Sequence, residues 1–201
     1  SSVSSYYGRV YEGKFVTGAI AGALADNNRI GYIASYPIYG QMANINAFAL
    51  GAQFTNPRAK IHLRWSCVEG NPQADFFADG IRVISNRDAP GQNKMYLDFC
   101  SYGTYLMDDN GELVPLGSPV WVWGKFYEYV LNGMFSGTWK SEKANGTALN
   151  YWLGMDSGVI SVNLSDHLPE GLRALAEYLR TGLSTRTIDP FARRIVAQDG
   201  T

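Results

Sequence analysis

The sequence predicts an α/β fold with a mostly parallel sheet and helices on both faces. Apolar strand patterns alternate with helical patterns between residues 29 and 90, and parallel strands need such helical crossovers. Hydrophobic residues make up 46% of the chain and charged residues 17%, the composition of a globular protein rather than a disordered one. A chain of 201 residues can also bury a substantial core.

The first expected element is a helix over residues 8–25. Its apolar face repeats every fourth residue: Tyr11, Phe15, Ala19 and Ala23. Gly18 and Gly22 lie on a neighbouring face, where we expect them to permit tight packing of the helix against the sheet. We expect no strand before these glycines, so they do not form a dinucleotide-binding loop. The abrupt start of the helix suggests a piece of a longer protein.

The next elements are strands over 29–37, 59–67 and 81–90, with helices over 40–57 and 71–80 between them. Beyond residue 90 the regularity changes. Residues 108–111 (DDNG) predict an Asn-Gly hairpin turn rather than a calcium loop, because the EF-hand spacing is absent. A helix ending near residue 135, two short strands within 148–165 and an amphipathic helix over 169–183 complete the expected elements.

The charge and cysteine content exclude several classes of function. A net charge of −1 gives no electrostatic reason for a nucleic-acid partner, and the longest apolar run, residues 16–25, is about half a membrane span. Cys67 and Cys100 are too few for a disulfide scaffold or a zinc site, and we expect both to be free and buried. His62 and His167 lack the spacing of metal ligands, so no metal or cofactor is expected.

Catalytic motifs are also missing. The chain has neither a nucleophile elbow nor a phosphate-binding loop of the Walker type. Asp88, Asp156 and Asp166 could meet in space as paired carboxylates, but their spacing gives no support for this. The prediction is therefore a protein that is not an enzyme and has no catalytic residue.

The carboxyl ends of the strands are the expected ligand site, because open α/β sheets bind ligands beyond these ends. The segments at these ends supply flat aromatic rings and a few polar groups: Tyr36, Tyr39, Trp65, Asn86, Asp88, Trp121 and Trp123. Such a set suits a small planar polar ligand, such as a nucleobase or nucleoside, since rings stack on the base and a carboxylate can bind ribose hydroxyls. For each tryptophan the alternative is a half-buried packing residue, and for Asp88 it is a turn or helix cap.

The segment 120–124 (VWVWG) is predicted to be a strand end that leads into a helix. Alternation places Trp121 and Trp123 on one side of the strand, with Val122 opposite. Both tryptophans then face either the ligand cleft or the helix-covered core. We expect Gly124 to let the chain turn tightly into the helix.

Several segments together resemble the basic membrane protein (BMP) family of ABC-transporter solute-binding proteins. They are "YYGRVYEGKFVTGAIAG", "RIGYIASYPIYGQMANINAFALGAQFTNPRAKIHLRW", "GSPVWVWGKFYEYVLNGMFSGTW", "YWLGMDSGV" and "DPFARRIVAQDG". The resemblance implies a type I periplasmic-binding fold, in which two lobes close around a solute, commonly a purine nucleoside.

The resemblance covers the second lobe and the segments that return to the first lobe. It implies a single unit over 1–201, with 27–138 as the core of the second lobe, 1–26 and 139–201 as hinge-side and lobe-crossing segments, and the first lobe absent. It also implies an ABC permease as partner and an extracytoplasmic location, with membrane attachment only through an N-terminal lipoprotein anchor that this chain lacks.

The chain departs from the family pattern at two points. Arg87 stands before Asp88, where many members have threonine, and Trp123 takes a position near which nucleoside-binding members carry lysine. Two other functions therefore stay open. The chain could be the ligand-sensing domain of a larger intracellular regulatory protein or, as a third choice, an α/β enzyme that uses Asp88.

Overall fold

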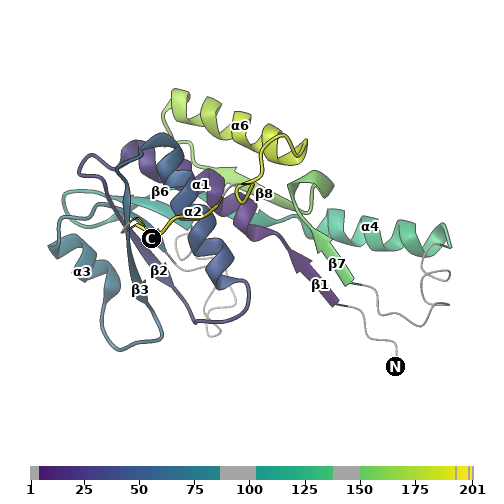
Figure 1. Ribbon diagram of the computed structural model, residues 1–201, viewed down its shortest axis with the longest axis horizontal. Coiled ribbons are helices and arrows are strands. Elements are labelled where there is room, and N and C mark those ends of the chain that lie inside the picture. Colours follow the sequence, from purple (N-terminus) through teal and green to yellow (C-terminus); the bar gives the residue numbers. More distant parts are fainter. Residues whose placement is uncertain (1–4, 87–102, 138–149, 193, 199, 201) are drawn as a thin grey trace.

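The computed structural model describes residues 5–86, 103–137, 150–192, 194–198 and 200, and Figure 1 shows two parts. The body is built on a six-stranded sheet, and a smaller part projects from it. The elements are β1 (Ser5–Gly8), α1 (Val10–Leu24), β2 (Arg29–Ala34), α2 (Gln41–Thr55), β3 (Lys60–Trp65), α3 (Pro72–Ala78), β4 (Val83–Asn86), β5 (Gly103–Met107), β6 (Leu113–Trp121), α4 (Trp123–Phe135), β7 (Asn150–Leu153), the 3₁₀ turn η1 (Met155–Ser157), β8 (Ile160–Leu164) and α6 (Glu170–Ser184).

The body sheet has the strand order β3-β2-β4-β5-β6-β8. β2 pairs in parallel with β3 and β4, whereas β5 runs against β4 and β6, and β8 runs against β6. Strands β2, β3, β4 and β6 therefore point the same way, which confirms the predicted α/β class with a mostly parallel sheet. Their carboxyl ends lie at one edge, which carries Trp65, Asn86 and Trp121.

Helices cover both faces of this sheet. On one face, α1 and α6 pack over β6 and β8, and α2 packs over β2. On the other face, Phe76 of α3 is fully buried against Ile33, Ile84 and Tyr105. Burying a phenylalanine side chain contributes about 2–3 kcal/mol, so this ring helps to anchor the short helix to the sheet.

The paired glycines of α1 serve a helix–helix contact. A β-carbon on Gly18 would lie 2.1 Å from the carbonyl oxygen of Phe48 in α2, and one on Gly51 would lie 2.0 Å from that of Phe15. The expected close approach is confirmed, but its partner is helix α2 and not the sheet. Glycine at these positions lets the two backbones meet without side chains between them.

The hairpin between β5 and β6 forms as predicted. Gly111 has φ +81°, and the carboxylate of Asp108 accepts hydrogen bonds from the amides of Asn110 (2.8 Å) and Glu112 (2.9 Å). This geometry identifies the segment as a turn. Cys67 is free, as expected, but it is exposed rather than buried because it lies in the loop after β3; Cys100 lies outside the described residues.

The projecting part combines β1, β7 and α4 (Figure 1). β1 and β7 form a separate two-stranded parallel sheet, so the expectation of no strand before α1 was wrong: β1 is only four residues long and alternates too briefly to be recognised. α1, β8 and α6 belong to the body, whereas α4, within the expected core of 27–138, lies beside β7.

Candidate ligand-binding site

The described chain passes between the body and the projecting part at three crossings: Gly8–Arg9, Trp121–Trp123 and Leu153–Gly154. The amide of Arg9 donates a hydrogen bond to the carbonyl of Leu153 (2.8 Å), and the amide of Val122 donates one to Val159 (2.8 Å). These bonds tie each crossing to a neighbouring strand end. The candidate site lies where the crossings meet the carboxyl edge of the sheet.

One aromatic cluster surrounds the carboxyl end of β6. Trp121 ends β6, Trp123 begins α4, and their rings stack with centroids 4.7 Å apart and an interplanar angle of 9°. Tyr6 of β1 meets both rings edge-on, at 6.0 and 6.1 Å. The two tryptophans therefore share one side, as predicted.

Their environments differ, however. Trp121 packs against the body core and next to Gly8, whereas Trp123 remains 42% exposed. The turn expected at Gly124 was wrong, because Gly124 lies inside the first turn of α4 and Val122 (φ −95°, ψ 76°) makes the change of direction. The pair thus combines a packing residue with an accessible aromatic face.

A second aromatic cluster joins the loop after β2 to the projecting sheet. Tyr7 of β1 stacks on Trp152 of β7 with centroids 4.1 Å apart, and Tyr39 meets Tyr7 edge-on at 5.8 Å. Gly40 has φ +84°, and a β-carbon there would lie 2.6 Å from the hydroxyl of Tyr7. Burial and, second, the neighbouring Tyr39 raise the pKa of Tyr7, so its hydroxyl stays protonated at neutral pH.

The other predicted site residues belong to neither aromatic cluster. Tyr36 is exposed, Trp65 packs partly into the core beneath α2, and Asn86 is half-buried at the end of β4. Asp88 lies outside the described residues. The structure therefore brings Tyr39, Trp121 and Trp123 to the projecting part. It also adds Tyr6, Tyr7 and Trp152, which lie in two segments that carry the family resemblance but were not predicted as site residues.

A network of four charges holds two of the crossings together. Arg9, which is buried, donates to Glu12 Oε1 (2.6 Å), to the carbonyl oxygen of Trp152 (2.8 Å) and to Asp156. Glu12 Oε2 accepts the amide of Met155 (2.7 Å). Arg186, after α6, donates from Nε to Asp156 Oδ2 (2.8 Å).

The network sets the charge states of its members. Burial by itself would raise the pKa of Asp156, but the hydrogen bond from Arg186 and the charge of Arg9 outweigh it and lower that pKa. Burial by itself would lower the pKa of Arg9, but Glu12 and Asp156 raise it. Both groups are therefore charged at neutral pH, and the pairing offsets the desolvation cost of burying them.

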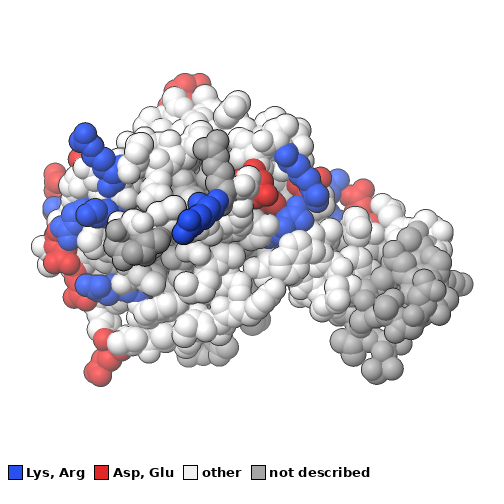
Figure 2. Space-filling model, viewed as in Figure 1, with Lys and Arg blue, Asp and Glu red and all other residues white. Residues whose placement is uncertain are grey.

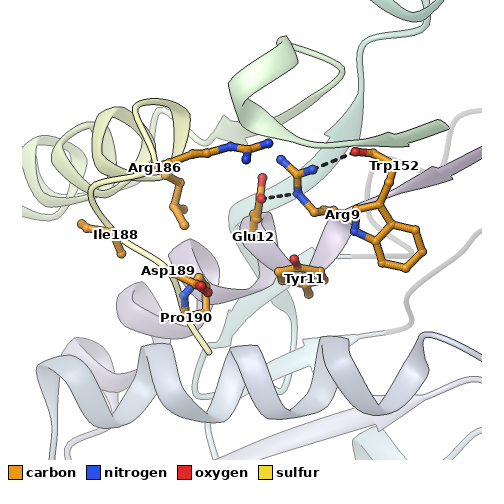
Figure 3. A pocket seen from close by; sticks show the side chains of 9 residues that line it. Arg9, Tyr11, Glu12, Trp152, Arg186, Ile188, Asp189 and Pro190 are labelled. Atoms are coloured by element: carbon orange, nitrogen blue, oxygen red, sulfur yellow. Dashed lines mark hydrogen bonds and ion pairs between the residues drawn. The ribbon is translucent and has the colours of Figure 1, made fainter. Parts of the chain in front are cut away.

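A cavity of about 410 Å³ opens beside this network. Figure 3 shows Arg9, Glu12 and Arg186 on one side of it, with Tyr11, Trp152 and Asp189 around the rest. The guanidinium of Arg9 bonds to three acceptors, and both carboxylate oxygens of Glu12 accept a bond. The hydrogen bonds of Arg9 and Glu12 are therefore made within the protein, and they link the Gly8–Arg9 crossing to the Leu153–Gly154 crossing.

On the face seen in Figure 2, basic and acidic side chains mix over the body and the junction, and the described atoms of the projecting part are mostly uncharged. Among the described residues, no three His, Cys, Asp or Glu side chains gather where they could hold a metal ion. None of the helices within the described ranges is long and apolar enough to span a membrane.

Comparison with known proteins identifies relatives of this chain. Residues 1–68 match the model of the Bmp family, described as PnrA-like ABC transporter substrate-binding proteins. A putative ABC transporter glucose-binding protein, TsgA13 of Haloferax volcanii, is 30% identical over 171 residues, which are 79% of this chain and 41% of the relative. The purine-binding protein BAB2_0673 of Brucella abortus is 28% identical over 209 residues, 99% of this chain and 58% of the relative.

A solved ABC transporter solute-binding protein from Conexibacter woesei has the same fold, with a TM-score of 0.62 at 13% identity over 92% of this chain and 64% of that protein. The chain spans about half the length of the two sequence relatives. Together, the family match over β1, α1, β2, α2 and β3, the two relatives and the shared fold support a relationship between this chain and the Bmp family of ABC transporter substrate-binding proteins.

Proposed function

We propose that this chain is the second lobe and the lobe-crossing part of a solute-binding protein that captures a nucleoside-like molecule for an ABC importer. The observation that carries the proposal is the aromatic lining of the crossings, where Tyr39 and Trp123 present exposed rings at the carboxyl edge of the sheet. Flat, accessible rings next to a few polar groups suit a planar polar ligand.

The first lobe is supplied by the remainder of the longer protein. A stripe on α4 is exposed at every member (49–58%) and repeats at helical spacing: Tyr127, Leu131 and Met134. The β1–β7 sheet has two strands, and so small a sheet is marginally stable alone. Among the described residues, β1 and β7 pair with no third strand. An apolar helix stripe beside such a sheet is what a lobe interface leaves when its other half is missing.

One sequence relative is named for binding purine and the other for binding glucose. The purine-binding relative aligns with 99% of this chain and the glucose-binding relative with 79%. Purines and sugars both stack on aromatic rings, but only a base presents a planar hydrogen-bonding edge, which the amide of Asn86 could pair with. Asp88 stays a proposed ribose contact.

Two consequences follow for the whole protein. Closure of two lobes over the solute would present a docking surface to an ABC permease. The protein would act outside the cytoplasm, attached through an N-terminal lipid anchor. The alternative, a ligand-sensing domain of an intracellular regulator, predicts a DNA-binding or signalling region upstream in place of a lipoprotein signal.

The test uses the full-length protein, purified without added ligand. Native mass spectrometry identifies any solute that co-purifies, and calorimetry then measures binding of adenine, adenosine and glucose. We expect adenine or adenosine to bind in the micromolar range or tighter and to be recovered unchanged. Binding of glucose alone would overturn the nucleoside assignment but keep the solute-binding function, and turnover of adenosine that is lost in Asp88→Asn would replace both with the enzyme hypothesis.

A further inference from the structure

The side chain of Gln198, near the C-terminus, pairs with the backbone of β3. Its Oε1 accepts the amide of Ile61 (2.5 Å) and its Nε2 donates to the carbonyl of the same residue (3.1 Å). An amide side chain that bonds both groups of one residue reproduces the pattern that a neighbouring antiparallel strand would form. Gln198 therefore occupies the place of a strand residue.

β3 is the outer strand of the body sheet, with β2 as its neighbour. The amides of Lys60 and Ser66 bond to the β2 side, at Asn28 and Ala34, so the alternating residues Ile61 and Leu63 direct their backbone groups away from the sheet. Within the described part of the chain, the amide of Leu63 has no hydrogen-bond partner. An edge of this kind can accept a strand from another molecule.

The segment that carries Gln198, here called the C-terminal strap (residues 188–192 and 194–198), is anchored along its path. Ile188 packs onto Gly182 at the end of α6, and the ring of Phe191 lies 5.1 Å from that of Tyr11 in α1. In Figure 1 the strap then runs from α6 across the helices toward β3. Two apolar anchors thus hold the strap at one end and the Gln198 pairing holds it at the other.

We propose that the C-terminal strap guards the edge of the sheet, and that the partner it excludes is β3 of a second copy of this chain. Natural β proteins protect edge strands with covering segments and with charged side chains. The strap supplies the covering segment at Ile61. The proposal concerns a surface away from the crossings and does not depend on which solute the protein binds.

The charges of β3 form a second protection. Lys60, His62 and Arg64 alternate along the strand and share one face. In an antiparallel pair of two β3 strands centred on His62, Lys60 of one copy would lie opposite Arg64 of the other, and like charges opposite one another are destabilising. This repulsion is screened by salt, so an unguarded edge should associate more at high ionic strength.

The experiment compares the full protein with its Gln198→Leu variant, which keeps the size of the side chain and removes both hydrogen bonds. Val196→Ala is the matched control, because Val196 is an exposed residue of the same strap. Amide hydrogen exchange followed by NMR should show Ile61 exchanging about tenfold faster in Gln198→Leu. The fully buried Ile30 of β2 should be unchanged.

Sedimentation velocity in 0.1 M and 1 M NaCl then measures self-association. We expect Gln198→Leu to form dimers or larger species at 1 M NaCl. The sedimentation coefficients of the unmodified protein and of Val196→Ala should be the same at both salt concentrations. Unchanged exchange at Ile61 would show that Gln198 does not cover the edge in solution. Faster exchange without self-association at either salt concentration would reduce the strap to a local clamp, and either result overturns the proposal.

Discussion

Gly8 and Trp121 lie so close that a β-carbon on Gly8 would fall 2.2 Å from Cζ2 of the indole. Gly8 ends β1 and Trp121 ends β6, so the contact joins two of the three crossings. The second indole of the pair, Trp123, stacks on the first. The absence of a side chain at Gly8 therefore makes room for the indole of Trp121, on which Trp123 stacks.

Gly8→Ala should destabilise the protein by about 1–3 kcal/mol, because the added methyl group must displace an indole that is held on its other face. Chemical denaturation monitored by tryptophan fluorescence measures both the stability and the environment of the pair. Gly171→Ala is the control, since a β-carbon there meets no atom within 4 Å and alanine favours the helix. Equal stabilities of the two variants would contradict the tight contact at Gly8.

Arg9→Ala should cost about 3 kcal/mol, because it leaves Glu12 and Asp156 without their shared partner in a largely buried setting. The exposed pair Lys125–Glu128 has the same three-residue spacing as Arg9–Glu12. Lys125→Ala should change the stability by less than about 1 kcal/mol. A small effect at Arg9 as well would mean that the network does not fasten the crossings.

The stability of the protein should fall in acid partly through Asp156. Its pKa in the folded state is lower than in the unfolded chain, where it is about 3.9. The stabilisation is therefore complete above about pH 4 and is lost as the pH falls through the folded-state pKa. Asp156→Asn should be less stable at pH 7 and show a shallower loss below pH 4, as measured by denaturant titrations from pH 7 to pH 2.

His62 should titrate below its ordinary value of 6.5. Burial is the main cause of its lowered pKa, followed by the charges of Arg29 and Arg64. The folded state then prefers the neutral ring, so this group contributes stability above pH 6.5 and loses it as the pH falls. An NMR titration of the imidazole should give a midpoint below 6.5, and Arg29→Gln should raise the midpoint more than Lys60→Gln does.

The element order of the body could be predicted from the sequence because its helices and strands are long and bounded by clear signals. Asn71 caps α3 by accepting the amide of Ala74, Pro72 follows it, and Gly80 with φ +73° ends the segment. Such signals are local. The pairing of β1 with β7 is not, since it joins residues about 145 positions apart through four-residue strands.

Only part of the candidate site could be predicted from the sequence, because its other residues come together through long-range pairing. Tyr39 and the tryptophan pair follow strand ends, which a sequence pattern can locate. Tyr6 and Tyr7 lie on β1, and Arg9 follows it directly. β1 is too short for its alternation pattern to predict a strand, so the sequence does not place these residues at the site. Arg9 reads as an ordinary helix-start residue until the fold brings Asp156 beside it.

Trp123→Ala in the full-length protein should weaken solute binding by about 1–3 kcal/mol, the value of one base stacked on an aromatic ring. The exposed part of the Trp123 indole would stack on the solute, and the ring of Trp121 packs against its other side and supports its orientation. Trp123→Phe should recover most of the affinity, because a smaller ring still stacks, and Tyr178→Ala, an exposed aromatic on α6, should change nothing. Calorimetry that finds the same affinity for Trp123→Ala as for the unmodified protein would make Trp123 a packing residue of the crossing.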